Sequence, residues 1–123
     1  MSSADTHQTL CAAAKATLDK KAFNLLALEV SELTSYADSF LICSAGSDRQ
    51  VTAIADEVGR RLRDVGRRPL HREGSSGSEW VLLDFGDLVV HVFTEEKRSY
   101  YALENLWGDA PRIEIESLEA QDG

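Results

Sequence analysis

The sequence has few basic residues for its length. Its 123 residues include 13 Lys and Arg against 21 Asp and Glu, so the formal net charge is -8 at pH 7. Proteins that bind the phosphate backbone of nucleic acids take most of their affinity from Lys and Arg. The composition therefore argues against DNA or RNA binding as the main function, and it favours a basic partner such as a basic protein.

Long apolar runs are missing as well. The longest uncharged apolar segments are too short to cross a bilayer, and the first residues lack the basic-then-apolar order of a signal peptide. We therefore expect a cytosolic protein without membrane contact. Of the two cysteines, Cys11 falls in an expected helix and Cys43 in an expected buried strand. We interpret both as small apolar residues and not as a disulfide.

Patterns that would build a metal or catalytic site are also lacking. His7, His71 and His91 are far apart in the sequence and show no metal-ligand spacing. The metal-binding acids of a nucleotidyltransferase share one face of a strand, but Asp84 and Asp87 are three residues apart across a predicted turn, so their carboxylates do not. We therefore expect a non-enzymatic protein that holds no metal and no cofactor.

What the chain does contain is a clear succession of apolar patterns. They predict a helix from Asp5 or Thr6 to about Lys20, strands over 23–30 and 38–45, a helix over 47–65, a short strand over 70–72, a hairpin over 80–93 and a last helix from Thr94 to Trp107. This order predicts an α/β fold (mixed α+β) with helices packed against a mixed sheet. We expect one domain over 1–111 and an acidic tail over 112–123, partly disordered, in which Ile113 and Ile115 are able to dock on a sheet edge.

The hairpin is the most informative segment. Gly86 and Asp87 separate two apolar runs, and glycine at the first central position is what a type II′ turn requires. With a two-residue loop, the strands present one aliphatic face to the core: Val81, Leu83, Phe85, Leu88, Val90 and Val92. The opposite face, called here the outer hairpin face, carries Trp80, Leu82, Asp84, Val89, His91 and Phe93.

The outer hairpin face is too apolar to be ordinary solvent-exposed surface, which is mostly polar. Either another element of the chain covers it, or a partner does. The last helix is the internal candidate, because Tyr101 and Trp107 lie on it and Tyr100 shares the helical face of Trp107. We favour partner binding, because Trp and Tyr at the edge of an apolar face are typical binding anchors.

Two other segments offer alternative functions. Gly46 and Ser47 form a turn that enters the 47–65 helix, where a nucleotidyltransferase-like enzyme would hold a nucleotide phosphate. The purely structural interpretation is a capping box, in which Ser47 caps the helix and Gln50 reaches back. The arginine cluster Arg60–Arg68 would suit an RNA-binding ribosome assembly factor. No aromatic residues interleave with it, so we favour a solvated helix end in which arginines satisfy the last carbonyls. The same helix is predicted to bury one stripe: Val51, Ile54, Ala55, Val58, Leu62 and Val65.

Four segments together point to a known family. They are DSFLI at 38–42, GSDRQVTAIA at 46–55, WVLLDFGDLVVHVF at 80–93 and YYALENLW at 100–107. In this order they resemble the Iojap family, whose bacterial members are the ribosomal silencing factors (RsfS). The resemblance runs from the first helix to about Ala110. It implies a nucleotidyltransferase-like fold without the catalytic acids.

The resemblance also implies a partner and a mechanism. The partner is the large ribosomal subunit, bound through large-subunit ribosomal protein fourteen at the surface that meets the small subunit. A bound factor blocks subunit joining and lowers translation when nutrients are scarce, with at most a secondary contact to ribosomal RNA. Family members also pair with themselves, so a homodimer is expected. The residues implied at or near the ribosomal contact are Trp80, Leu82, Asp84 and His91, with Arg98, Tyr100 and Glu104 at its margin.

Overall fold

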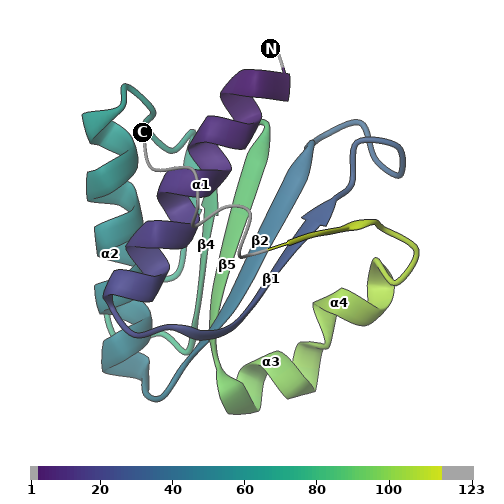
Figure 1. The fold of residues 1–123 in the computed structure, drawn as a ribbon. Helices are drawn as coiled ribbons and strands as arrows, with labels where there is room; N and C mark the ends of the chain where they lie inside the picture. The colour runs from purple at the N-terminus through teal and green to yellow at the C-terminus, as the bar shows by residue number, and fades with distance from the viewer. Residues whose placement is uncertain (1–2, 115–123) are drawn as a thin grey trace.

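A computed structural model describes residues 3–114, apart from the side chains of residues 3–6, 103 and 104. The elements are α1 (Ser3–Asp19), β1 (Phe23–Glu29), β2 (Ser39–Ala45), α2 (Asp48–Asp64), β3 (His71–Glu73), β4 (Trp80–Asp84), β5 (Leu88–Thr94), α3 (Glu95–Tyr101), α4 (Leu103–Leu106) and β6 (Arg112–Ile113) (Figure 1). The mixed α+β class is confirmed. Among the residues described, no helix combines the length and apolar character needed to cross a membrane.

The strands form one mixed sheet in the order β3-β4-β5-β2-β1-β6. β2 runs parallel to β5, and the other neighbouring strands are antiparallel. Every residue of β2 is buried. This confirms the burial on both faces that its apolar sequence predicts, because a strand covered from both sides has no polar face.

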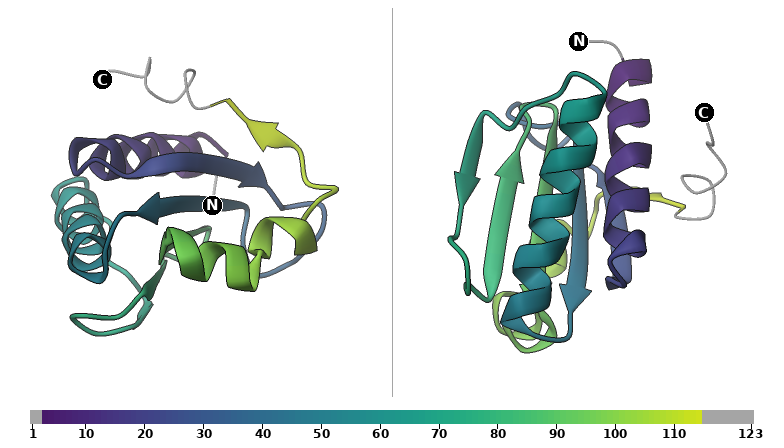
Figure 2. Two further views of the ribbon diagram at one scale, coloured as in Figure 1. Left: turned by 90° about the horizontal axis from the view of Figure 1, so that it is seen from below. Right: turned by 90° about the vertical axis from the view of Figure 1, so that its left-hand side faces the viewer.

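Helices cover both faces of this sheet (Figure 2). α1 and α2 pack together on one face, and α3 and α4 lie on the other. The larger core cluster fills the space under α1 and α2 and includes Cys11 and Cys43, which are free and buried. Their interpretation as small apolar residues is confirmed. A smaller cluster that includes Phe40 and Phe93 lies on the α3–α4 side.

The hairpin forms in the predicted register. Leu83 lies opposite Val90 in the β4–β5 ladder, and the Phe85 N–H donates to the Leu88 carbonyl at 2.8 Å. Gly86 has a φ of +96°, which an L side chain rarely adopts and a type II′ turn requires at its first central position. The six residues predicted on the core face all belong to the larger cluster.

The prediction of one last helix from Thr94 to Trp107 is wrong. Thr94 does cap a helix, its Oγ1 accepting the Lys97 N–H at 3.3 Å, but that helix ends at Tyr101. Ala102 lies in the left-handed region with φ 47° and ψ 48°, and α4 begins after it. The break changes the helical phase that placed Tyr100 with Trp107. Tyr100 is 76% exposed as a result, and Tyr101 is the tyrosine that packs against the sheet.

The start of α2 has the predicted cap with one difference. Ser47 Oγ accepts the Gln50 N–H at 3.1 Å. The Gln50 side chain reaches back to the Gly46 N–H, at 2.5 Å, and not to the Ser47 N–H as expected. Gln50 Nε2 also donates to the Lys20 and Lys21 carbonyls at 3.1 Å. The Gln50 side chain therefore links the end of α1 to the start of α2. The bonds of its Nε2 to the two carbonyls place its Oε1 beside the Gly46 N–H.

The end of α2 departs from the predicted stripe at one residue. Val65 was expected to be buried, but it is 59% exposed. The helix ends at Asp64, and Gly66 then turns the chain with a φ of +82°. Val65 therefore lies in the cap, where the helical phase no longer directs its side chain to the sheet.

The far edge of the sheet contains a bulge and a short added strand. The β1–β2 register shifts between Phe23 and Leu26, and Asn24 has a φ of +53° there. On the other side of β1, β6 pairs Ile113 with Ala27. Docking of Ile113 on a sheet edge is thus confirmed, and the sheet extends past residue 111. Ile115 and the rest of the predicted tail lie outside the described residues.

Candidate partner-binding face

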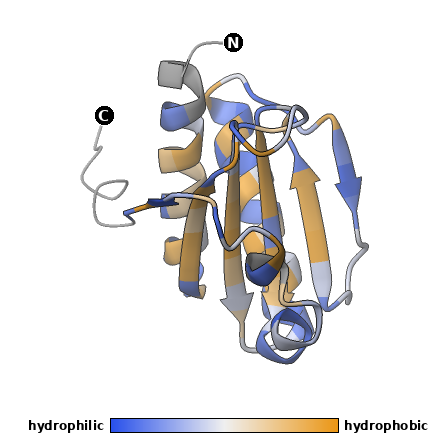
Figure 3. Cartoon of the chain, turned by 90° about the vertical axis from the view of Figure 1, so that its right-hand side faces the viewer, coloured by the Kyte–Doolittle hydropathy of each residue, from blue (hydrophilic) through white to orange (hydrophobic). Residues whose placement is uncertain are grey.

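The β4 strand carries the residues expected to contact a partner, and it lies at the uncovered margin of the outer hairpin face. Trp80, Leu82 and Asp84, called here the β4 site, alternate with buried residues and are each half-buried. Viewed from the α3–α4 side, β4 lies beside these helices and β3 forms a hydrophilic edge next to it (Figure 3). Cover by the last helices is therefore partial, and the β4 site keeps access to solvent.

An aromatic cluster holds Trp80 in place. The Trp80 ring stacks on Phe93 with centroids 5.1 Å apart and lies 4.8 Å from the Tyr101 ring. Its Nε1–H donates to His91 Nδ1 at 3.3 Å. One side of Trp80 therefore packs under α3, as the internal-cover alternative predicts, while the rest of the side chain is accessible to solvent.

His91 lies within this cluster and not at its surface. It is 6% exposed and packs edge-on against Phe40, with ring centroids 5.6 Å apart. Burial lowers the pKa of His91 to about 4, because the charged imidazolium loses its hydration there. The neutral ring accepts the Trp80 N–H. His91 therefore supports the β4 site from below, and its contribution to binding would act through Trp80.

Asp84 and the neighbouring β3 strand supply the polar part of the face. Asp84 Oδ1 accepts the Gly86 N–H at 2.8 Å, which fixes the carboxylate beside the hairpin turn. The β3–β4 register places His71 opposite Asp84 and Glu73 opposite Leu82. Opposite residues of an antiparallel pair share a face, so these two exposed side chains flank the β4 site. Sequence reasoning missed them, because a three-residue edge strand has too little alternation to reveal its register.

The three residues expected at the margin are placed differently from one another. Tyr100 is exposed on α3, with Lys97 Nζ 5.5 Å from its ring centroid. Arg98 extends from α3 to the sheet, where Nη1 donates to Ser44 Oγ at 2.9 Å and to the Asn24 carbonyl. It docks α3 on the β1 bulge. Glu104 belongs to α4, but its side chain lies outside the described residues.

Two groups of the Gly46–Ser47 turn that could bind a nucleotide phosphate are bonded within the chain instead. The Gly46 N–H is bonded to Gln50 Oε1, and Ser47 Oγ accepts the Gln50 N–H. These bonds close the turn within the chain, as the capping interpretation predicts. Within the described part of the chain, no group of three His, Cys, Asp or Glu residues is placed to hold a metal ion.

The arginine cluster is largely engaged in ion pairs. Arg60 and Arg61 each bond to Glu57 Oε2 at 2.6 Å, and Arg61 also pairs with Asp19. These two guanidiniums lower the pKa of Glu57 to about 2. A cluster that is already neutralised by its own carboxylates is a poor site for RNA phosphates.

The interpretation of the arginine cluster as a solvated helix end is wrong for Arg67. Its Nη2 bonds to Asp87 Oδ1 at 2.5 Å and to the Phe85 carbonyl at 3.0 Å, and its Nη1 bonds to Thr9 Oγ1 at 2.9 Å. The Asp87 side chain is only 5% exposed. We call this group the Arg67 clasp, and it ties α1 and the end of α2 to the hairpin turn that presents Asp84.

Known proteins resemble this chain over most of its length. The family model "Ribosomal silencing factor during starvation" matches residues 3–123. The ribosomal silencing factor of Bacillus subtilis is 47% identical over 104 residues, covering 85% of this chain and 88% of that protein. The maize chloroplast protein Iojap is 36% identical over 105 residues, covering 83% of this chain and 44% of that protein.

Solved structures agree as well. A crystal structure of a Chromobacterium violaceum protein has a TM-score of 0.78 at 40% identity, covering 81% of this chain and 83% of that one. A Bacillus halodurans structure has a TM-score of 0.75 at 42% identity, covering 85% and 95%. With a family model that spans nearly the whole sequence, the chain belongs to the RsfS family of ribosomal silencing factors.

Proposed function

We propose that the chain silences translation by binding the large ribosomal subunit through the β4 site and preventing the small subunit from joining. Family membership supports ribosome-associated silencing, since the relatives are named as silencing factors and not as enzymes. The observation that carries the proposal is the β4 site itself. Trp80 and Leu82 remain half-buried beside a fixed carboxylate, although two helices lie on the same face of the sheet.

The chemistry of this surface suits a basic protein partner. Trp80 and Leu82 supply apolar area for the centre of an interface, and Asp84 and Glu73 supply negative charge at its border. The net charge of -8 draws the chain towards basic surfaces, which raises the association rate. Large-subunit ribosomal protein fourteen is the partner that we propose, and a bound factor would occupy the place of the small subunit there.

Co-sedimentation with separated ribosomal subunits tests the proposal. The variant is the pair Leu82→Ala and Asp84→Asn, because alanine keeps the strand intact and asparagine keeps an oxygen for the Gly86 N–H. The matched control is Val65→Ala with Asp64→Asn, which removes an aliphatic group and a charge at the exposed end of α2, on the opposite face of the sheet.

We expect the wild type and the control to pellet with the large subunit alone. The β4 variant should bind about tenfold more weakly, since the loss of a central interface residue costs more than 1 kcal/mol. Pelleting with neither subunit would contradict the function. Undiminished binding of the β4 variant would keep the function and remove the β4 site from it.

A second copy of the chain is also proposed to use the β4 site in solution, because two exposed apolar surfaces of one kind tend to pair. Dimer and ribosomal complex would then exclude each other. Sedimentation velocity of the wild type and of the β4 variant measures the dimer. If the variant loses the dimer while its ribosome affinity is unchanged, the two interactions do not share a surface.

A further inference from the structure

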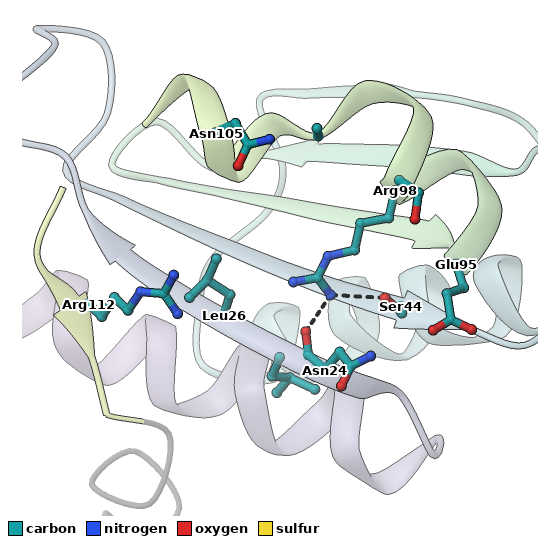
Figure 4. A pocket seen from close by; sticks show the side chains of 10 residues that line it. Asn24, Leu26, Ser44, Glu95, Arg98, Asn105 and Arg112 are labelled. Carbon is teal, nitrogen blue, oxygen red and sulfur yellow. Dashed lines mark hydrogen bonds between the residues drawn. The ribbon is translucent and has the colours of Figure 1, made fainter. Parts of the chain in front are cut away.

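A polar hollow lies on the α3–α4 side of the sheet, away from the β4 site. Its volume is about 610 Å³, within the range of pockets that hold small molecules. The residues that line it come from five elements and the turn between α3 and α4: Asn24, Leu25 and Leu26 of β1, Ser44 of β2, Glu95, Arg98 and Ser99 of α3, Ala102 of the turn, Asn105 of α4 and Arg112 of β6 (Figure 4). The hollow thus lies between the α3–α4 pair and the last strand, β6.

The topology of the sheet explains why a hollow forms here. β2 and β5 are adjacent and parallel, but β2 is followed by α2 on one face and β5 is followed by α3 on the other. Chains that leave neighbouring parallel strands towards opposite faces open a crevice at the carboxyl ends of those strands, where α/β proteins bind ligands. Ser44 lies near the end of β2, and Glu95 follows β5 directly.

The lining favours an anion although the chain as a whole is acidic. Among the side chains that the structure describes, two arginines, Arg98 and Arg112, and one acid, Glu95, line the hollow. The acid and Arg112 lie towards opposite ends of the hollow, with the Arg98 guanidinium between them (Figure 4). Amides of Asn24 and Asn105 and hydroxyls of serine add neutral donors. The described lining of the hollow is thus more basic than the chain as a whole, whose net charge is -8.

Arg98 is held in position before any ligand arrives. Its Nη1 donates to Ser44 Oγ and to the Asn24 carbonyl, the carbonyl of the residue that bulges from β1. These two bonds orient the plane of the guanidinium. A planar guanidinium held in this way binds a carboxylate or phosphate with little loss of conformational entropy.

We propose that this hollow binds a small organic anion that carries a phosphate or carboxylate group, held between Arg98 and Arg112. The hollow contains no residue of the β4 site, so it holds or fails independently of ribosome binding through that site. Arg98 then has two roles, docking α3 on the sheet and binding the anion. A ligand there would contact α3, α4 and β6 together and would fasten β6 and the helical pair to each other.

Titration of the isotope-labelled protein, followed by NMR of backbone amides and arginine Nε–H groups, tests the proposal. Pyrophosphate is the phosphate probe and citrate the carboxylate probe, and a short single-stranded RNA is the third arm. Arg112→Ala is the main variant, because Arg112 is exposed and its loss does not disturb the core. Arg63→Ala, an exposed arginine on α2 outside the hollow, is the matched control. Arg98→Lys is the second variant, with its fold checked by the same spectra.

We expect saturable shifts at Arg98, Arg112 and Asn105 with pyrophosphate, citrate or both, and the arm that binds identifies the anion. Arg112→Ala should weaken binding about tenfold, as the loss of a charge-assisted hydrogen bond does, while Arg63→Ala leaves it within about twofold. Absence of saturable shifts with both small probes would overturn the proposal. Equal weakening by Arg63→Ala would do the same, since it would indicate diffuse charge attraction. Arg112-dependent binding of the RNA alone would also refute a small-anion site.

Discussion

Protonation of His91 is expected to destabilise the fold, and the size of the effect follows from its surroundings. The ring lies among Phe40, Trp80 and Phe93, and burial lowers its pKa from the ordinary 6.5 to about 4. Because the folded pKa is below the unfolded one, the unfolded chain takes up the proton first on acidification. The stabilising effect of the neutral ring is therefore complete above pH 6.5 and is lost as the pH falls from 6.5 to about 4.

The difference between the two pKa values corresponds to about 3 kcal/mol once the ring is fully protonated. At about pH 5 the loss is about 2 kcal/mol, because most unfolded chains then carry the proton while few folded chains do. His91→Gln removes the titration but keeps an acceptor for the Trp80 N–H. His71→Gln is the control, because it replaces a histidine exposed on β3 and leaves His91 in place.

Urea unfolding at about pH 7.5 and about pH 5 measures the effect for each protein. Between these conditions the wild type and His71→Gln should lose about 2 kcal/mol more unfolding free energy than His91→Gln. If the wild type and His91→Gln lose stability in parallel, the buried ring is not the source of the acid sensitivity, and the reasoning is refuted.

Three further substitutions test parts of the structure, each by the free energy of unfolding in urea. Arg67→Ala should cost about 3 kcal/mol, because it removes the guanidinium that bonds to the buried Asp87 carboxylate; Arg68→Ala, at the exposed neighbour, is its control, and equal costs would refute the Arg67 clasp. Ala102→Gly should stabilise the chain by about 0.5–1 kcal/mol, because alanine is strained at φ 47°, and a loss of stability would contradict the helix break. Ser47→Ala should cost about 1 kcal/mol, and no cost would show that its bond to Gln50 is not a working cap.

The hairpin could be predicted from the sequence because its signals are local. Alternation along 80–93 identifies the two faces, and Gly86 defines the turn, so the register of Leu83 with Val90 follows. The buried β2 strand is predictable for the same reason, since its apolar run is continuous.

The features that escaped prediction depend on contacts between distant segments. Asp87 pairs with Arg67, twenty residues away, and nothing near either residue in the sequence indicates it. The helix break at Ala102 has no glycine or proline to mark it. It allows Tyr101 to reach Trp80, so the tertiary contact overrides the helical pattern.

The candidate site combines features that local sequence signals predict with features that depend on contacts between distant segments. Alternation alone identifies Trp80, Leu82 and Asp84 as one face of a strand. Whether that face is covered depends on where α3 and α4 lie, and the neighbours His71 and Glu73 depend on the register of a three-residue strand. The chemistry of the face was therefore predictable, but its extent and cover were not.

The central claim is that the bound chain prevents the two ribosomal subunits from joining. Light scattering of purified subunits after mixing tests it most directly, with the large subunit first incubated with the wild type, with the Leu82→Ala, Asp84→Asn variant or with the Val65→Ala, Asp64→Asn control. The account predicts that the wild type and the control suppress joining, whereas the β4 variant does so only at about tenfold higher concentration. Normal joining of large subunits that are saturated with the wild type would contradict it.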